Sequence, residues 1–238
     1  MKFFDAEITD IKKETHDVKT FRLDIDVDFL PGQYCLVSIK NDEEFENAKK
    51  PFTFSSAPGR GYTELTVKKV GEFTSALHSL REGEVLKISE PKGSSLVFDE
   101  TVKDDVVFIA GGSGITPFIS AIRYGVNNKM DNSFTLFFSN REYRDIIYRT
   151  ELSHLDNDFD NIKVVNTLTH SKDERWHGET GLINSEMVEN HLSSLENKVY
   201  YICGPPGMVE SMREMLSKLG IVDDKVFFEQ WELPGKQD

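Results

Sequence analysis

The chain has 238 residues, which is enough for two ordinary domains, each with its own hydrophobic core. Its 41 Asp and Glu outnumber its 28 Lys and Arg, and the net charge of −13 repels nucleic acid and anionic lipid. Neither is expected as a partner, and no apolar run reaches the roughly 20 residues that a membrane-spanning helix needs.

The first residues and the cysteines narrow the class of protein further. Carboxylates interrupt the segment Met1 to Glu7, where a secretory signal would need an apolar stretch, so we expect a cytoplasmic address. Cys35 and Cys203 are the two cysteines, too few for a disulfide framework, a four-thiolate iron-sulfur cluster or a structural zinc site. Any cofactor is therefore expected to be organic.

Residues 1 to about 100 are predicted to form an antiparallel barrel. Apolar and polar residues alternate over 20–25, which is typical of a half-buried strand, and turn residues such as Pro31-Gly32 separate the segments. Further strands are predicted over 33–39, 52–55, 64–69 and 85–90, with one short helix over 75–80.

After about residue 101 the pattern changes to apolar runs that alternate with helical segments. This order is typical of an α/β domain with a parallel sheet. The predicted strands cover 106–110, 134–138, 162–168, 199–203 and 226–229, and the predicted helices cover 117–124, 146–155, 185–192 and 208–219. The chain is therefore expected to contain two domains, 1–100 and 101–238.

A glycine-rich segment follows the buried-type strand at 106–110. In Gly111-Gly112-Ser113-Gly114 the glycines let the backbone turn sharply and approach a ligand closely. Pro117 suits the first helical turn because its missing N–H would have no partner there, and the helix dipole favours a pyrophosphate. The order of strand, loop and helix predicts a dinucleotide site, although such a turn can also be purely structural.

The segment continues as Ile115-Thr116-Pro117, with Pro where the usual dinucleotide fingerprint has a third Gly. In this form it resembles the pyridine-nucleotide loop of the ferredoxin–NADP reductase family. The resemblance implies an antiparallel six-stranded barrel that binds FAD, with FMN less expected, and an α/β parallel-sheet domain that binds NADH or NADPH. It also places Thr116 near the nicotinamide, although a polar residue at a helix start can serve the helix alone.

The segment Lys50-Pro51-Phe52-Thr53 resembles the family's flavin motif, Arg-x-Tyr-Ser/Thr. The resemblance implies that Lys50 neutralises a flavin phosphate, Phe52 packs on the isoalloxazine and the Thr53 hydroxyl hydrogen-bonds flavin N5. Lys lacks the planar fork of Arg and Phe lacks the phenol hydroxyl, so we expect weaker flavin binding than is typical. A plain barrel strand would also explain these residues.

The segment Gly71-Glu72-Phe73-Thr74 resembles the family's Gly-x-x-Ser/Thr loop, where a helix N-terminus and a hydroxyl meet the flavin pyrophosphate. Thr74 is the expected hydroxyl, and capping of the helix alone would explain it as well. Val67 and Lys68 lie where family members line the flavin ring edge with backbone groups, although a half-buried strand explains them equally.

Two further segments extend the resemblance to the end of the chain. Cys203-Gly204-Pro205 resembles the family's Cys-Gly-Pro motif and implies that Cys203 lies beside nicotinamide C4, although a free Cys is commonly a small buried hydrophobe. Phe228-Glu229-Gln230-Trp231 resembles the family's closing strand. It implies that Glu229 relays a proton or tunes charge and that Trp231 stacks on the flavin, whereas a core Trp would need no ligand.

The preference between NADH and NADPH depends on His170. Phosphate-selective family members carry Ser-Arg at this point, and His170 replaces the Arg. A mostly neutral imidazole is a poor partner for a 2′-phosphate, so NADH is favoured, although Arg141, Lys172 or Arg175 could supply the charge. The six His show no metal-binding spacing, and no metal site is expected.

We therefore expect an enzyme that moves a hydride from NAD(P)H to flavin N5 and passes electrons to a separate acceptor, ferredoxin-like or another small redox protein. The expected catalytic residues are Thr53, Cys203 and Glu229. The weakened flavin motif also fits a reductase that uses free flavin as its substrate. The sequence leaves open, in addition, an electron-transfer subunit of a larger complex and a non-catalytic nucleotide-sensing or interaction module.

Overall fold

The computed structural model describes residues 1–171 and 175–230, and the chain divides into two compact units. The first unit contains Met1–Asp99 and Thr116–Asn128, and the second contains Glu100–Ile115 and the chain from Lys129 onward. The helix that follows the glycine-rich loop therefore groups with the first unit, although the loop itself belongs to the second. Among the helices of the described residues, none has the length and apolar character to cross a membrane.

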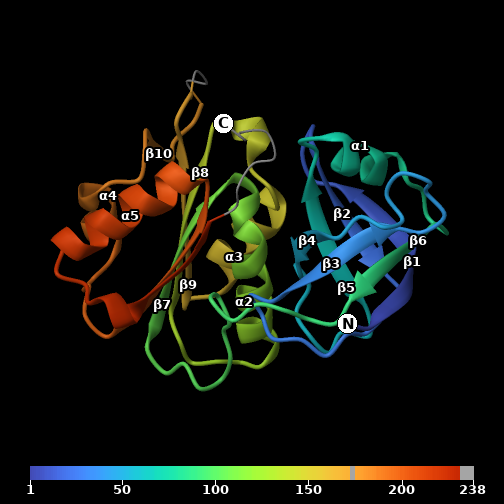
Figure 1. Cartoon of the computed structure of the whole chain (residues 1–238). Coiled ribbons are helices and arrows are strands. Elements are labelled where there is room, and N and C mark those ends of the chain that lie inside the picture. Colours follow the sequence, from blue (N-terminus) through green and yellow to red (C-terminus); the bar gives the residue numbers. More distant parts are fainter. Residues whose placement is uncertain (172–174, 231–238) are drawn as a thin grey trace. The chain divides into compact units, whose positions relative to one another are not determined.

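Six antiparallel strands build the first unit, which confirms the predicted barrel (Figure 1). They are β1 (Phe3–Lys13), β2 (Val18–Leu23), β3 (Tyr34–Ile39), β4 (Lys50–Thr53), β5 (Thr63–Lys68) and β6 (Val85–Ser89). They lie in the order β4-β3-β6-β1-β2-β5, and helix α1 (Glu72–Ser79) follows β5.

The two end strands of this sheet meet just beyond the end of β4. An isolated bridge joins Phe54 to Leu65, and the Ser55 N–H donates to the Glu64 carbonyl at 2.9 Å. These few contacts close the sheet into a near-barrel. We call residues 54–56 and 64–65 the seam.

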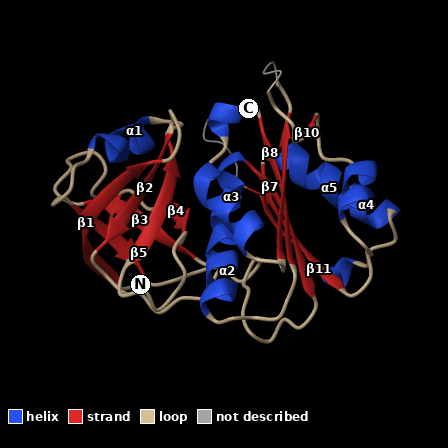
Figure 2. Ribbon diagram, turned by 180° about the vertical axis from the view of Figure 1, so that it is seen from behind, coloured by secondary structure: helices blue, strands red, loops and turns tan. Residues whose placement is uncertain are grey.

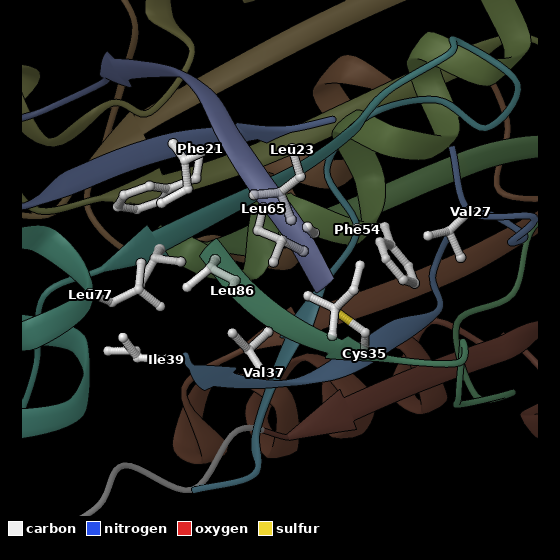
Figure 3. Close-up of a cluster of buried hydrophobic side chains, with 14 of the residues drawn as sticks. Phe21, Leu23, Val27, Cys35, Val37, Ile39, Phe54, Leu65, Leu77 and Leu86 are labelled. Atoms are coloured by element: carbon white, nitrogen blue, oxygen red, sulfur yellow. The ribbon is translucent and has the colours of Figure 1, made fainter. Parts of the chain in front are cut away.

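Buried side chains from all sides of the barrel fill its interior. Figure 3 shows this cluster, whose labelled members are Phe21, Leu23, Val27, Cys35, Val37, Ile39, Phe54, Leu65, Leu77 and Leu86. Cys35 is a free thiol in this cluster, and its burial raises the pKa of the thiol. It therefore behaves as a small hydrophobe, as a buried free Cys commonly does.

Strand β1 was not among the predicted strands. Its buried residues Ala6 and Ile8 alternate with the exposed Asp5 and Glu7, which is the period-two pattern of a half-buried strand. The carboxylates that argued against a secretory signal are thus the solvent-facing half of this strand. β1 pairs with both β2 and β6, so it lies inside the sheet.

A row of hydroxyl groups connects β2 and β5 with the seam. The Ser55 and Thr66 hydroxyls are 3.0 Å apart, and the Thr66 and Thr20 hydroxyls are 2.8 Å apart. Thr20 Oγ1 donates to a Glu14 carboxylate oxygen at 3.0 Å. Each buried hydroxyl of the row is therefore hydrogen-bonded, as buried polar groups usually are.

Six parallel strands build the second unit, which confirms the predicted parallel sheet. They are β7 (Asp105–Gly111), β8 (Phe134–Asn140), β9 (Ile162–Leu168), β10 (Glu179–Thr180), β11 (Lys198–Gly204) and β12 (Val226–Gln230), in the order β10-β9-β8-β7-β11-β12. β7 is central and buried over nearly its whole length, as expected of a strand covered on both faces.

Helices cover both faces of this sheet. They are α3 (Arg149–Asp158), α4 (Ser185–His191) and α5 (Pro206–Lys218), and Figure 2 shows α4 and α5 on the opposite face from α3. Helix α3 begins at Arg149 instead of residue 146, because Tyr148 adopts a left-handed φ of 57° directly before it. Ile109, Phe137 and Ile202 lie in the apolar cluster beneath α4 and α5.

Candidate functional site

The glycine-rich loop turns directly into helical backbone. Gly112–Ile115 forms a short 3-10 helix that continues into α2 (Thr116–Asn127). The helical segment therefore begins at Gly112, whereas the sequence predicted its start at Pro117. The N-terminal end of the segment, where the backbone N–H groups and the dipole favour an anion, accordingly lies at the glycines themselves.

Each of the three glycines of the loop is required, or tolerated, for a different structural reason. A Cβ atom on Gly111 would lie 2.6 Å from Met208 Sδ, and one on Gly114 would collide with the Cys203 carbonyl. Gly112 has a φ of 53°, and a Cβ there would meet no atom within 4 Å. Gly111 and Gly114 thus allow close packing against the segment 203–208, and Gly112 leaves an open side that a ligand can approach.

The Cys-Gly-Pro motif lies at the end of β11, beside this loop. A Cβ on Gly204 would lie 3.2 Å from the Gly111 nitrogen, so the two predicted motifs meet in one site of the second unit. Pro205 caps α5, and its carbonyl accepts the Met208 N–H at 2.9 Å. The Cys203 side chain is fully buried, and its position beside nicotinamide C4 stays a prediction.

Glu229 lies next to this motif in the sheet. The register of β11 and β12 pairs Cys203 with Glu229. Glu229 is half-buried, and desolvation of the carboxylate raises its pKa above the ordinary value. Trp231, the expected stacking residue, lies outside the described residues.

On the first unit, β4 presents the residues of the predicted flavin motif. Thr53 is 5% exposed, and its hydroxyl makes no hydrogen bond within the described residues. The half-buried Phe52 ring stacks on Phe73, with centroids 6.0 Å apart and planes at 20°. Lys50 is exposed and pairs with no carboxylate of the described chain. A nearly buried hydroxyl without a partner fits a ligand that offers one, such as a flavin ring nitrogen.

Thr74 already uses its whole hydrogen-bonding capacity within its own loop. Its hydroxyl accepts the N–H groups of Val70 (2.8 Å) and Gly71 (3.0 Å) and donates to the Gly71 carbonyl (3.0 Å). The N-cap of α1 is Gly71, and Thr74 occupies the third helical position. The expected contact of this hydroxyl with a pyrophosphate would require one of these bonds to break.

Val67 and Lys68 also have partners in the structure. The Val67 carbonyl lies 2.8 Å from His78 Nε2, and Lys68 Nζ lies 3.3 Å from an Asp17 carboxylate oxygen. Burial lowers the pKa of His78, which favours the neutral ring that joins α1 to β5. Lining of a flavin edge by the backbone of Val67 and Lys68 stays a prediction.

His170 lies at the exit of β9, next to the exit of β8. Its N–H donates to the Arg141 carbonyl at 2.8 Å, and its Nδ1 is 3.0 Å from the Thr169 hydroxyl. Both His170 and Arg141 are exposed, and this hydrogen bond holds their backbones side by side. Arg175 is exposed as well, and Lys172 lies outside the described residues.

Sequence reasoning missed the charged group beside the seam. Glu64 is 7% exposed and binds two guanidinium groups, those of Arg22 and Arg123. Arg22 and Glu64 face each other in the register of β2 and β5, a cross-strand pairing that the strand predictions could have suggested. Arg123 gives no such local signal.

Comparison with known proteins supports the same division of roles. Residues 5–96 match the oxidoreductase FAD-binding domain, and residues 108–214 match the oxidoreductase NAD-binding domain. The fold and these matches define a two-domain oxidoreductase with a flavin-binding barrel and a nucleotide-binding sheet.

Individual relatives are consistent with this class. The chain is 30% identical to the ferredoxin–NAD(P)(+) reductase CarAd of Metapseudomonas resinovorans, over 94% of this chain and 68% of that protein. It is 28% identical to the sulfhydrogenase 2 subunit gamma of Pyrococcus furiosus, over 90% of this chain and 79% of that protein. The solved ferredoxin reductase in carbazole 1,9a-dioxygenase superposes with a TM-score of 0.82 at 27% identity, covering 97% of this chain and 70% of that one.

The chain belongs to the ferredoxin–NADP reductase-like family of FAD- and NAD(P)-binding oxidoreductases. It is an FAD-dependent NAD(P)H oxidoreductase and an electron-transfer enzyme.

Two glycine substitutions should separate packing from ligand approach. Gly114→Ala forces the loop away from the Cys203 carbonyl, and we expect the free energy of unfolding to fall by about 2 kcal/mol or more. Gly112→Ala should cost only about 1 kcal/mol for its left-handed φ, but its methyl group enters the open side and should raise the KM for NAD(P)H. Urea unfolding and steady-state kinetics measure both effects. Equal stability losses would contradict the distinct roles.

The raised pKa of Glu229 predicts a pH-dependent stability. The folded state holds the Glu229 proton more tightly than the unfolded state, whose value is near the ordinary 4.5. The contribution of Glu229 to stability should therefore fall as pH rises from about that value through the folded-state pKa, and then level off. Glu229→Gln removes this loss, so its stability advantage over the wild type should grow with pH in that window.

Urea unfolding between pH 4 and pH 8 tests this expectation. Glu210→Gln, at an exposed position of α5, removes the same charge and is the matched control. An advantage of the Glu229 variant that does not change with pH would count against a desolvated carboxylate.

Proposed function

We propose that this enzyme takes a hydride from NADH to flavin N5 and passes the electrons to a separate redox protein. Bound FAD would supply the chemistry by accepting two electrons and releasing them singly or in a pair. The observation that carries the proposal is the nearly buried Thr53 hydroxyl, which makes no hydrogen bond within the described residues. It lies in the motif that resembles the family's flavin motif.

The other residues of the barrel site have complementary properties. The ring of Phe52 is half-buried against Phe73 and offers an aromatic face. The exposed Lys50 pairs with no carboxylate of the described chain, so its ammonium group is available to a flavin phosphate. Because the Thr74 hydroxyl is committed to its loop, we propose that it shapes the start of α1, and that backbone N–H groups of residues 72–74 meet the pyrophosphate.

On the second unit, we propose that the open side of Gly112 receives the dinucleotide pyrophosphate. Ser113 follows Gly112 in the same 3-10 turn, and Gly204 and Pro205 form the neighbouring wall. The chain continues directly from this turn into Thr116, the first residue of α2. Cys203 and Glu229 would lie toward the nicotinamide end, where a half-buried carboxyl with a raised pKa can hold a proton.

The separate acceptor is supported by the variety of the relatives. One is a ferredoxin–NAD(P)(+) reductase, and another is a subunit of a sulfhydrogenase. Chains similar to this one therefore occur both in a ferredoxin reductase and in a multi-subunit enzyme, and we propose that local surface charge and shape select the acceptor of this protein. Both cysteines are free thiols, as the reducing cytoplasm would keep them.

Use of free flavin as a substrate is the second candidate function. Lys50 replaces the bidentate Arg of the family motif, and the Thr74 hydroxyl is occupied by its own loop. Both features favour a weakly held flavin. FAD that remains bound through purification would argue against this candidate.

Exchange of Thr53 tests the proposed function directly. The purified protein should bind FAD and oxidise NADH with ferricyanide. Thr53→Val removes a hydroxyl that has no protein partner among the described residues, so thermal stability should be unchanged while the rate of flavin reduction falls about tenfold or more. The proposal would be wrong if the wild-type protein neither bound flavin nor oxidised NADH when flavin was added.

The matched control is Thr63→Val on the neighbouring strand. The Thr63 hydroxyl is fully buried and donates to the Ile25 carbonyl at 2.8 Å. Its loss should cost about 1 kcal/mol of stability and leave flavin reduction near the wild-type rate.

The proposed NADH preference has its own test at His170. The wild type should have a higher kcat/KM with NADH than with NADPH. His170→Arg adds a permanent charge beside Arg141 and should raise the kcat/KM for NADPH about tenfold. His154→Arg, at an exposed site of α3, adds the same charge and should leave the ratio unchanged. A wild type that prefers NADPH would refute the assignment.

A further inference from the structure

Helix α2 is hydrogen-bonded to the backbone just after β4, the strand that carries the predicted flavin motif. The Ser120 hydroxyl, fully buried, donates to the Ser56 carbonyl at 2.7 Å. Arg123 Nη1 donates to the Ser55 carbonyl at 2.7 Å and to a Glu64 carboxylate oxygen at 3.1 Å. All these residues belong to the first unit.

The anchored carbonyls are ones that the barrel cannot satisfy by itself. β4 ends at Thr53, and among the described residues no backbone N–H is donated to the carbonyls of Ser55 and Ser56. Buried carbonyls without a partner are costly, so α2 supplies what the open end of the seam lacks. The anchor lies within three residues of Thr53.

The spacing along α2 places its first residue on the anchored face. Thr116, Ser120 and Arg123 are separated by four and three positions, so they share one side of the helix. Thr116 is also the residue with a proposed position near the nicotinamide. One helix face therefore carries both the anchor and a residue of the proposed reaction site.

The Glu64 carboxylate adds a charged hydrogen bond to this anchor, but it does not depend on Arg123 alone for a partner. Glu64 Oε1 accepts from Arg22 Nε at 3.1 Å and Nη2 at 2.9 Å, while Oε2 accepts from Arg123. Removal of Arg123 therefore leaves Glu64 paired with Arg22, and no buried charge is left alone. A variant at position 123 should fold.

We propose that Arg123, together with Ser120, is a positioning residue for hydride transfer. Resting on the proposed function, the inference is that these side chains fix Thr116 relative to Thr53 through the seam. Arg123 touches neither substrate nor cofactor in this role. Small displacements of reacting groups cost large factors in rate, so loosening the anchor should slow the reaction while binding persists.

Arg123→Met in the full-length protein tests the inference by two measurements. Without added cofactor, amide hydrogen exchange of the first two turns of α2 should accelerate about tenfold. With FAD bound, the rate constant of flavin reduction at saturating NADH should fall about tenfold, while the Kd for FAD and the half-saturating NADH concentration change less than about twofold. Arg123→Lys should restore part of both losses, and Ser120→Ala should show the same pattern more weakly.

Arg60→Met is the matched control, because the exposed Arg60 reaches Asn127 at the other end of α2 at 3.3 Å. It should leave exchange in the first turns and flavin reduction at wild-type values. Unchanged exchange in the Arg123 variant, or faster exchange with a wild-type reduction rate, would overturn the inference alone. If NADH did not reduce the flavin of the wild-type protein, the proposed function would be wrong, and the inference with it. The exchange measurement would still show whether Arg123 stabilises the start of α2.

Discussion

Closure of the barrel along the seam is the constraint on which the arrangement of the first unit depends. At the seam, a bridge joins Phe54 to Leu65, the Ser55 N–H donates to the Glu64 carbonyl, and the Glu64 N–H donates to the Ser56 hydroxyl. The strand ladder stops at Thr53, so the next carbonyls need partners from elsewhere, and α2 provides them. Residues 54–56 thus follow the end of β4, close the sheet and bind α2.

The architecture could be predicted because its signals are local. Period-two alternation marked most barrel strands, and the buried run of β7 followed by glycines marked the nucleotide-binding unit. β1 was not predicted because its two fully buried residues are the small Ala6 and Ile8, and both have carboxylates as neighbours. The start of the helical segment at Gly112 was not predicted because glycine disfavours helix, whereas here the glycines form a 3-10 turn that leads into α2.

Other features depend on contacts between distant segments, which local patterns do not encode. Arg123 and Glu64 are 59 residues apart in the chain, and Ser120 and Ser56 are 64 apart. The two candidate roles of Thr74 could be distinguished only by the path of its loop, which brings two backbone N–H groups to one hydroxyl. Similarly, the sequence around Gly111 and Gly114 could not show why glycine is needed there, because the atoms that exclude a side chain belong to the distant segment 203–208.

The row of hydroxyls behind the seam has a fixed polarity. Thr20 gives its only proton to Glu14, so Thr66 must donate to Thr20, and Ser55 must donate to Thr66. The three O–H dipoles therefore line up head to tail, with their positive ends toward the carboxylate, and strengthen one another. At the Ser55 end only oxygen lone pairs remain, so the row presents its electron-rich end to the backbone that follows Thr53.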